Sequence, residues 1–322
     1  MVVTDKTTKV SVCVQTYNHE KYIRQCLQSI VDQETGFDYE VIVGDDCSTD
    51  NTRTIVQEFA DKHPSIIRTI FQAKNTGGWK NHLDLHGAAR GEYVAHVDGD
   101  DFWLPGKLAT QVDFLERWDG CSAVWSNAIV ISDNGQLIGQ FNGKIPEHFD
   151  INYLIERGNF LNNSSIMYRS VFLEKIINIK AKVIDFYICM LMAEHGSLGY
   201  INRPLVAYRH GSTSSVIKNS LSFIHSLYWQ AILRARYMGA GTTSIARCIT
   251  DFYGSILSTT VKQGKFHELW FWSIKIYRES QSLLAGSFFN AVALFPFRLI
   301  LSKFRKLARR LMYHGTNILF PR

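Results

Sequence analysis

In the N-terminal third of the chain, short apolar runs alternate with stretches whose apolar positions recur at helical spacing. The runs at 10–14 (VSVCV), 39–43 (YEVIV) and 93–97 (YVAHV) are rich in β-branched and aromatic residues, which predicts buried strands. Between them, apolar residues three and four positions apart predict one helix over 23–31 and another through 55–59. Strands that alternate with helices in this way are typical of an α/β fold with a mostly parallel sheet.

The rest of the chain divides into a second α/β stretch and a helical region. The predicted elements are helices over 107–116 and 184–194 and strands over 121–132 and 199–208. The segment 140–174 has no consistent period, apart from a strand-like stretch at 166–168 (IMY) that follows a polar run at 162–165 (NNSS). From about residue 220 onward the pattern is helical and rich in aromatic residues. We therefore expect an α/β domain over 1–218 and a helical C-terminal region over 219–322.

Composition describes an ordinary folded protein. Of the 322 residues, 46% are hydrophobic and 20% are charged, which excludes a disordered chain. The six cysteines are widely scattered and lack metal-binding spacing, so we expect free thiols in a reducing compartment. The N-terminal stretch MVVTDKTTKV has no apolar signal core, and we expect a cytoplasmic protein.

Positive charge is concentrated at the C-terminus. The formal net charge is +6, and residues 280–322 hold seven Lys or Arg and no acids. The remaining 28 basic and 29 acidic residues nearly cancel. A near-neutral body of this kind lacks the basic surface that nucleic acids require, so we expect no nucleic-acid partner.

Two stretches of this C-terminal region suggest contact with a membrane surface. Residues 283–301 are nearly all apolar, but Asn290, Pro296 and Arg298 make the stretch marginal for a membrane span. The next residues form an amphipathic helix pattern, with Ile300, Phe304, Leu307 and Leu311 on one face and Lys303, Lys306, Arg309 and Arg310 on the other. Such a helix lies in the plane of an anionic membrane, or alternatively packs on the catalytic domain with a solvated basic face.

Three acids follow the strand over 93–97. Asp98, Asp100 and Asp101 lie within four residues, in the stretch GEYVAHVDGDDFW. Carboxylates this close repel one another unless a cation lies between them, and Mg²⁺ or Mn²⁺ prefers such oxygen ligands. The alternative is a solvated acidic turn. An EF-hand is excluded because its ligand spacing is missing.

Four blocks of sequence together resemble a known family. They are VSVCVQTYNHEKYIRQCLQSIVDQ, YEVIVGDDCSTDNT, ARGEYVAHVDGDDFW and IDFYICMLMAEHGSLGYINRPLVAYRHGSTS. In this order they are similar to the family 2 inverting glycosyltransferases, in the variant found in bacterial surface-polysaccharide synthesis. The resemblance covers Lys9 to Ser215 and implies a GT-A fold, in which a Rossmann-like sheet is flanked by helices. It also implies a nucleotide-sugar half over about 1–103 and an acceptor half over about 104–218.

The resemblance implies a set of donor-binding residues. Asp46 matches the acid that pairs with a pyrimidine base, while Asp98 approaches the ribose and diphosphate. Lys80 stands where a diphosphate contact is expected. The full expected nucleotide-binding set is Gln15, Tyr17, Asn18, Asp46, Lys80 and Asp98. Core packing of Tyr17, turn formation by Asp46 and simple solvation of Lys80 are the structural alternatives.

The resemblance also implies the metal site and the base. Asp100 matches the acid that holds the metal, Mn²⁺ or Mg²⁺, and His210 resembles a histidine near it. Asp185 aligns with the base that deprotonates the acceptor, although an acid at a helix start also favours the helix dipole. The role of Asp101 stays open, and Trp103 either lines the acceptor pocket or packs in the core.

These residues predict a metal-dependent inverting glycosyltransferase. We expect it to move a sugar from a nucleoside diphosphate donor, UDP-sugar in the first instance, to a hydroxyl of a lipid-linked glycan. With a polyprenyl diphosphate as the lipid carrier, such an acceptor would place the protein peripherally on the inner face of the cell membrane. The alternatives are a nucleotidyltransferase that makes the sugar nucleotide and a catalytically silent nucleotide-sugar-binding scaffold. No glycine occurs in QTYNHEKY after the first strand, which disfavours the nucleotidyltransferase and excludes a dinucleotide oxidoreductase.

Overall fold

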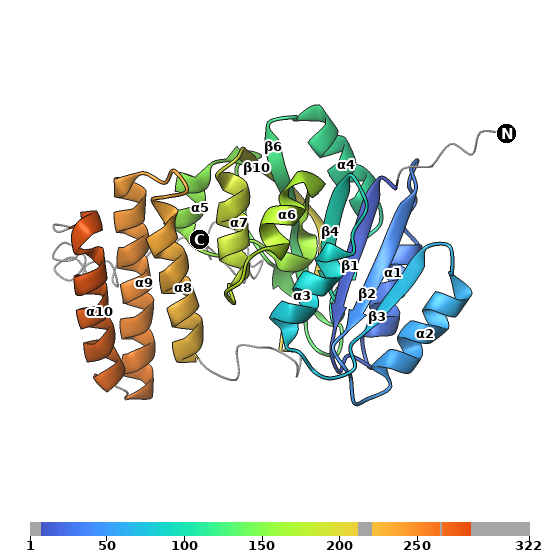
Figure 1. The fold of residues 1–322 in the computed structure, drawn as a ribbon, viewed down its shortest axis with the longest axis horizontal. Helices are drawn as coiled ribbons and strands as arrows, with labels where there is room; N and C mark the ends of the chain where they lie inside the picture. Colours follow the sequence, from blue (N-terminus) through green and yellow to red (C-terminus); the bar gives the residue numbers. More distant parts are fainter. Residues whose placement is uncertain (1–7, 212–220, 265, 285–322) are drawn as a thin grey trace.

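A computed structural model describes residues 8–211, 221–264 and 266–284 of the chain. Its N-terminal part alternates strands and helices as the hydrophobic pattern predicts (Figure 1). In chain order these elements are β1 (Val10–Thr16), α1 (Ile23–Val31), β2 (Tyr39–Asp45), α2 (Thr52–Lys62), β3 (Ile67–Phe71), α3 (Gly78–Gly87) and β4 (Tyr93–Asp98).

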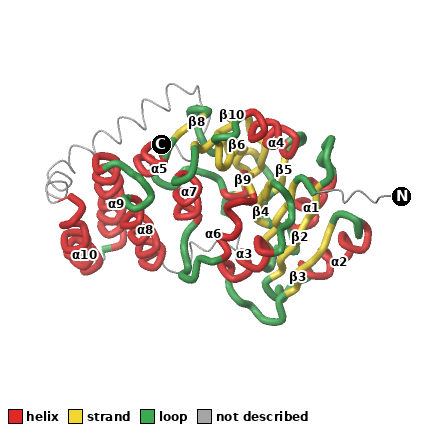
Figure 2. The backbone as a smooth tube through the Cα atoms, turned by 45° about the horizontal axis from the view of Figure 1, so that its top comes forward, coloured by secondary structure: helices red, strands yellow, loops and turns green. Residues whose placement is uncertain are grey.

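The strands form one mixed, mostly parallel sheet in the order β3-β2-β1-β4-β9-β6-β10-β5. The first four of these strands are parallel, and β6 is parallel to β10. Between the two parallel groups, the short β9 runs antiparallel to both β4 and β6 (Figure 2). The remaining strands are β5 (Phe102–Trp103), β6 (Cys121–Ile131), β7 (Leu137–Gln140), β8 (His148–Phe149), β9 (Met167–Arg169) and β10 (Ser197–Arg209).

The stretch over 140–174, which has no consistent hydrophobic period, consists of very short elements. Between β8 and β9 lie α5 and a 3₁₀ turn at Asn163–Ser165, and a second 3₁₀ turn at Ser170–Phe172 follows β9. Elements of two to seven residues are too short to show a helix or strand period. The helices of this half are α4 (Lys107–Arg117), α5 (Ile151–Arg157), α6 (Leu173–Ile177) and α7 (Asp185–Ala193).

Alternate residues of the central strands supply two cores, one on each face of the sheet. In β1, Val12 and Val14 pack with α1, α2 and α4, whereas Cys13 packs on the opposite face with α3. In β2, Ile42 likewise faces the second core. This is the period of two that an extended strand requires, and burial on both faces explains the continuous apolar runs.

Three helices continue the second core beyond the sheet. They are α8 (Leu221–Ala235), α9 (Thr242–Gln263) and α10 (Phe266–Leu284), which confirms the predicted helical character within the described residues 221–264 and 266–284. Trp229 and Trp272 are buried in the same cluster as Leu154 of α5 and Phe186 of α7. Figure 1 shows α8 beside α7 and α10 as the outermost helix.

Some predictions concern residues that the structure does not describe. The expected boundary at residue 218 lies within 212–220, and the basic amphipathic helix lies within 285–322; both segments are outside the described residues. The apolar stretch 283–301 is outside them from residue 285 onward. Over 8–211, 221–264 and 266–284, no helix has the length and hydrophobicity needed to cross a membrane.

Gly91 is predicted to be essential for the packing of β4. A Cβ atom at this position would lie 2.5 Å from the backbone N of Ser11 and 2.8 Å from the carbonyl O of Tyr93. Because backbone atoms cannot move aside cheaply, we expect Gly91→Ala to lower the free energy of unfolding by about 1–3 kcal/mol. Urea denaturation measures the change. Gly120→Ala is the matched control, since a Cβ there meets no atom within 4 Å; equal stability of the two variants would contradict this packing.

Candidate active site

The carboxyl ends of β1, β2 and β4 meet at one edge of the sheet. In register, Gln15 of β1 lies between Gly44 of β2 and Asp98 of β4, and Thr16 lies opposite Asp45. In open α/β sheets, ligands bind beyond this edge. The acids at the ends of β2 and β4 therefore converge on one edge of the sheet.

The acidic turn after β4 is fastened by Asp101. This side chain is only 3% exposed. Its Oδ2 accepts a hydrogen bond of 2.6 Å from the Ser164 hydroxyl, and its Oδ1 accepts one of 2.8 Å from the backbone N–H of Arg209. Asp101 thus joins the turn to the 3₁₀ turn before β9 and to the end of β10.

Ser164 also orders the residues on either side of the turn. Its hydroxyl accepts from the backbone N–H of Asp98 at 3.0 Å, and its carbonyl O accepts from Trp103 Nε1 at 2.9 Å. Trp103 is 2% exposed, and the Lys107 ammonium lies 4.0 Å from its ring centroid. Of the two roles left open for Trp103, this burial supports core packing.

Arg209 holds the same turn from the opposite side. Its guanidinium is buried and donates to the carbonyl O atoms of Asp100 at 3.0 Å and Asp133 at 2.9 Å. The residue after it, His210, is exposed, and its backbone N–H donates to the carbonyl O of Ile131 at 2.8 Å. His210 therefore lies directly after β10, next to Arg209, which contacts the acidic turn.

The acids of the turn interact strongly with one another. Burial raises the pKa of Asp101, and the charges of Asp100 and Asp98 raise it further. Displacement of water by the surrounding protein also acts to raise the pKa of Asp98. A hydrogen bond from His96, together with electrostatic attraction from the neighbouring histidines, outweighs this effect, and the net shift is downward. Carboxylate oxygens that repel one another in this way are the donor set that fits Mg²⁺ or Mn²⁺.

Asp46 closes the edge at the end of β2. Its Oδ1 accepts from the Thr76 backbone N–H at 2.7 Å and hydroxyl at 2.9 Å, and its Oδ2 accepts from the Gly77 N–H at 2.9 Å. Asp46 therefore holds the loop before α3. Gln15 Nε2 donates to the carbonyl O of Gly78, the first residue of α3, at 3.1 Å. Two carboxylate oxygens offer about four lone-pair sites, so Asp46 retains capacity for another donor.

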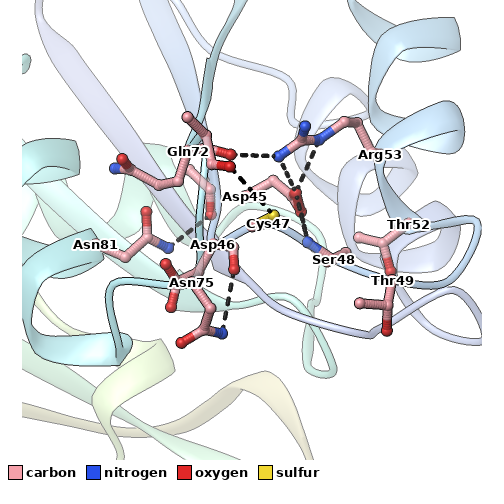
Figure 3. A network of polar contacts seen from close by, with 12 residues as sticks. Asp45, Asp46, Cys47, Ser48, Thr49, Thr52, Arg53, Gln72, Asn75 and Asn81 are labelled. Atoms are coloured by element: carbon pink, nitrogen blue, oxygen red, sulfur yellow. Dashed lines mark hydrogen bonds and ion pairs between the residues drawn. The ribbon is translucent and has the colours of Figure 1, made fainter.

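Asp45 is structural and fully buried (Figure 3). It accepts from the Ser48 backbone N–H at 3.0 Å and from Arg53 Nε at 3.1 Å, and Arg53 in turn donates to the carbonyl O of Gln72 at 2.8 Å. These contacts tie β2, α2 and the end of β3 together. Adjacent acids at 45 and 46 thus hold different loops.

The other expected donor-binding residues lie around this edge. Asn18 adopts φ of 55°, and its Oδ1 accepts from the Thr49 backbone N–H at 2.8 Å, so it clamps the loops after β1 and β2. Tyr17 is 38% exposed, which is compatible with ring stacking by a ligand. Lys80 is an exposed residue of α3 and forms an ion pair with Asp84 one helical turn later.

Asp185 begins α7, far along the chain from the acidic turn. Its side chain is solvent-accessible, yet displacement of water by the surrounding protein raises its pKa, and the negative charge of Asp98 raises it further. Two carboxylates influence each other in this way only at short range. The start of α7 therefore lies within the range of the Asp98 charge.

A cluster of three buried histidines lies beneath Asp98. His82 and His86 come from α3 and His96 from β4, and a possible ligand atom of each lies within 4.8 Å of the others. His96 Nε2 lies 3.2 Å from Asp98 Oδ1. The sequence shows these histidines without a recognised metal spacing, and only the packing of α3 on β4 brings them together.

Sequence reasoning also missed Ser164 and Arg209. Their partners are backbone groups, the Asp101 carboxylate and the Gln25 amide, all more than sixty positions away, so no local spacing reports the contacts. The polar run 162–165 between two apolar stretches is the one available signal for Ser164.

Comparison with known proteins assigns the family. A model of Glycosyl transferase family 2 matches residues 11–177, slightly more than half of the chain. The chain belongs to glycosyl transferase family 2. The match contains β1 to β4 and the acidic turn, and it ends before Asp185.

Several bacterial relatives share part of the sequence. An uncharacterized protein of Mycobacterium tuberculosis is 32% identical over 219 residues, or 66% of this chain and 63% of the relative. The putative teichuronic acid biosynthesis glycosyltransferase TuaG of Bacillus subtilis is 33% identical over 133 residues, or 41% of this chain and 51% of TuaG. The Escherichia coli UDP-Glc:alpha-D-GlcNAc-diphosphoundecaprenol beta-1,3-glucosyltransferase WfgD is 31% identical over 147 residues, or 46% and 55% of the two chains. The family 2 chain thus spans less than two thirds of each of these relatives.

A solved structure supports the fold. The crystal structure of residues 1–349 of Staphylococcus aureus TarS in complex with UDP-GlcNAc has a TM-score of 0.60 to this structure, with 89% of this chain and 80% of that chain covered. Sequence identity is 19%, so the likeness concerns the fold alone. It confirms the predicted GT-A architecture.

The histidine cluster predicts a pH dependence of stability. Burial lowers the pKa of His82 to about 3 and that of His86 well below its usual range, so both are neutral in the folded chain. In the unfolded chain each takes up a proton near its usual pKa of about 6.5. The unfolded state then binds more protons, and the free energy of unfolding falls as the pH falls below this value, by up to about 1.4 kcal/mol per pH unit for each histidine.

Urea denaturation at several pH values between about 7 and 5 measures this slope. His82→Phe keeps a ring at the same place and should make the slope shallower, whereas the exposed His267→Gln should leave it unchanged. A slope that is the same in His82→Phe and in the unmodified chain would contradict the burial of a neutral His82.

Proposed function

We propose that this chain is a metal-dependent, inverting glycosyltransferase that uses a nucleoside diphosphate sugar, UDP-sugar in the first instance. The acceptor would be a hydroxyl of a glycan. The proposal is supported above all by the edge where β1, β2 and β4 end, which brings Asp98 beside Gln15 and is held by Ser164 and Arg209 from the second half of the chain. The acids proposed to act there are Asp98, the last residue of β4, and Asp185, at the start of α7. Inverting transfer needs a donor site and a base on opposite sides of the anomeric carbon, and these two acids are the candidates for the two sides.

The donor would bind along the ends of β1, β2 and β4. Asp46 would accept a hydrogen bond from the ring N–H of the base through the capacity that the 76–77 loop leaves free. Tyr17 would stack on the base, with Gln15 and Asn18 shaping the same loops. UDP-GlcNAc bound to TarS and UDP-Glc in the name of WfgD support a uridine nucleotide.

The acidic turn would hold the diphosphate. Asp100, with His210, is the proposed metal site, and Asp98 would face the ribose and diphosphate. When bound, Mg²⁺ or Mn²⁺ would neutralise the charge that the leaving diphosphate gains. The chain's own contribution is a rigid turn, because Ser164 and Arg209 hold Asp101 and the backbone on either side of Asp100. Lys80, on α3 near the Gln15 contact, would add a positive charge.

Asp185 would remove the proton from the acceptor hydroxyl. An efficient base has a pKa raised toward the working pH, and the surroundings of Asp185 and the charge of Asp98 act in this direction. When the proton reaches the Asp185 carboxylate, the acceptor oxygen attacks the anomeric carbon as the bond to the diphosphate breaks. The sugar is thereby transferred with inversion.

The acceptor is proposed to be a lipid-linked glycan of surface-polysaccharide synthesis. WfgD acts, by its name, on a sugar diphosphoundecaprenol, and TuaG is named for teichuronic acid synthesis. The seven basic residues within 280–322 would bring the protein to the inner face of the membrane, where such an acceptor is embedded. The protein would accordingly be a cytoplasmic enzyme bound peripherally to the membrane.

Two substitutions separate binding from chemistry. We expect Asp185→Asn to lower the turnover of sugar transfer by about 10²–10⁴-fold, since a general base contributes this much, while UDP affinity stays unchanged. We expect Asp100→Ala to abolish metal-dependent hydrolysis of UDP-sugars and metal-dependent UDP binding. Calorimetry with UDP and Mn²⁺ measures binding, and release of UDP measures turnover.

Asp113→Asn is the control, because Asp113 is an exposed acid of α4 that pairs with Arg117. Full turnover in Asp185→Asn would exclude this residue as the base. Retained UDP binding without any hydrolysis or transfer, tested over a panel of nucleotide sugars, would favour a silent binding protein.

Deletion of residues 285–322 tests the proposed membrane contact. The deletion removes Arg298 and six further basic residues, so we expect the truncated chain to move from the membrane fraction to the soluble fraction. Sedimentation with vesicles containing anionic lipid measures the same change in purified protein. Equal sedimentation of the full and truncated chains would contradict the contact.

A further inference from the structure

A continuous line of hydrogen bonds runs from the core to Asp98. The Tyr168 hydroxyl lies 2.6 Å from His86 Nδ1, and His86 Nε2 lies 3.0 Å from His96 Nδ1. His96 Nε2 lies 3.2 Å from Asp98 Oδ1. The three inner side chains are each 1% exposed, whereas Asp98 lies at the surface edge with 40% of its side chain accessible.

The chemistry of the two ends sets the direction of this line. An ionised Asp98 carboxylate only accepts hydrogen bonds, so His96 Nε2 carries a hydrogen and donates it. At the other end, the buried Tyr168 hydroxyl has a hydrogen that needs an acceptor, and the ring nitrogen of His86 supplies it.

Hydrogen counting then settles the middle of the line. Burial and the neighbouring histidines lower the pKa of His86 well below its usual range, so His86 is neutral and carries one hydrogen. Because its Nδ1 accepts from Tyr168, that hydrogen is on Nε2 and is donated to His96 Nδ1. Every donor in the line therefore points toward Asp98.

The ring geometry disfavours a metal ion at these histidines. A metal lies in the plane of each imidazole that binds it, about 2.0–2.1 Å from the nitrogen. The rings of His82 and His86 are instead stacked, with centroids 3.9 Å apart and planes inclined by 26°. Stacked rings direct their lone pairs side by side rather than toward a common point. Trp79 stacks on the outer face of His82, with ring centroids 5.5 Å apart.

We propose that Tyr168, His86 and His96 are positioning residues, which form a directional hydrogen-bond relay that orients the carboxylate of Asp98 for the nucleotide. The inference rests on the proposed donor site and adds residues that are remote from it. His96 Nε2 donates to Oδ1 of Asp98, and this hydrogen bond restrains rotation of the carboxylate. The other oxygen, Oδ2, then faces the position proposed for the ribose and diphosphate of the donor. Such a restraint lowers the cost of ordering the site when the donor binds.

The first experiment determines the tautomers without any ligand. Full-length protein labelled with ¹⁵N-histidine is studied by long-range ¹H–¹⁵N correlation NMR at neutral pH, with assignment by single His→Gln variants. We expect His86 and His96 both to carry hydrogen on Nε2 alone. A hydrogen on Nδ1 of His96, either as the other tautomer or as an imidazolium, would overturn the proposed direction.

Tyr168→Phe tests whether the far end is connected. It removes the hydroxyl and leaves the ring stacked on His86, where the centroids are 5.9 Å apart. We expect the Nδ1 resonance of His86 to shift and the Nε2 resonance of His96 to follow in the same variant. An unchanged His96 would overturn the relay.

The second experiment measures UDP affinity in the presence of Mn²⁺. We expect His96→Leu to weaken binding about tenfold, since a hydrogen bond to a charged group is lost. His96→Gln retains an N–H donor and should recover most of the affinity. His82→Phe keeps the cluster packed and lies outside the relay, so it should bind as the unmodified chain does; an equal loss there would overturn the proposal, because packing alone would explain it.

The outcomes distinguish the relay from the proposed function. If the unmodified chain binds no uridine nucleotide, the proposed function fails, and the NMR tautomers still decide the relay. If the unmodified chain binds UDP, and His96→Leu and His96→Gln bind it with the same affinity as the unmodified chain, the relay fails and the proposed function stands. Titration with Co²⁺ covers the remaining possibility: a stoichiometric tetrahedral absorption spectrum that disappears in His82→Phe would replace the relay by a metal site.

Discussion

The Asp101 carboxylate is buried where three separate parts of the chain meet, and the arrangement of the acidic turn depends on the hydrogen bonds that this carboxylate accepts. A buried acid is costly unless hydrogen bonds or opposite charges compensate for lost water. Here Ser164 and the Arg209 backbone supply both donors, while the charges of Asp98 and Asp100 still raise its pKa. The turn is therefore held by hydrogen bonds to two other parts of the chain while its acids repel one another, and the divalent ion that we propose at Asp100 would relieve this repulsion.

This constraint also explains the mixed topology of the sheet. Parallel strands β1 to β4 alone could present Asp98, but only the antiparallel β9 brings the preceding turn, with Ser164, under it. In the same way β10 runs beside β6 and returns to β5, which carries Arg209 to the acidic turn. The second half of the chain thus completes a site that the first half begins.

Local patterns predicted the strands, the helices and the positions of Asp46, Asp98 and Asp100, because each of these follows from residues close together in sequence. The burial of Asp101 and Trp103 and the contacts of Ser164, Arg209 and His86 depend on segments many tens of residues apart, and no spacing encodes them. Of the short elements over 140–174, the strand-like stretch at 166–168 predicted β9; the others escaped prediction for a different reason, since an element of two or three residues has no period. Asp185 lies between these cases: its helix was predicted, but only the fold shows that the charge of Asp98 acts on it.

We propose that the edge formed by β1, β2 and β4 holds a nucleoside diphosphate and a cation together. Anomalous diffraction from crystals of the protein grown with UDP and Mn²⁺ tests it directly. We predict one manganese peak beside the Asp100 carboxylate, with the uracil ring beside Tyr17 and Asp46. A peak at the His82, His86 and His96 cluster, or UDP bound away from the ends of these strands, would contradict it.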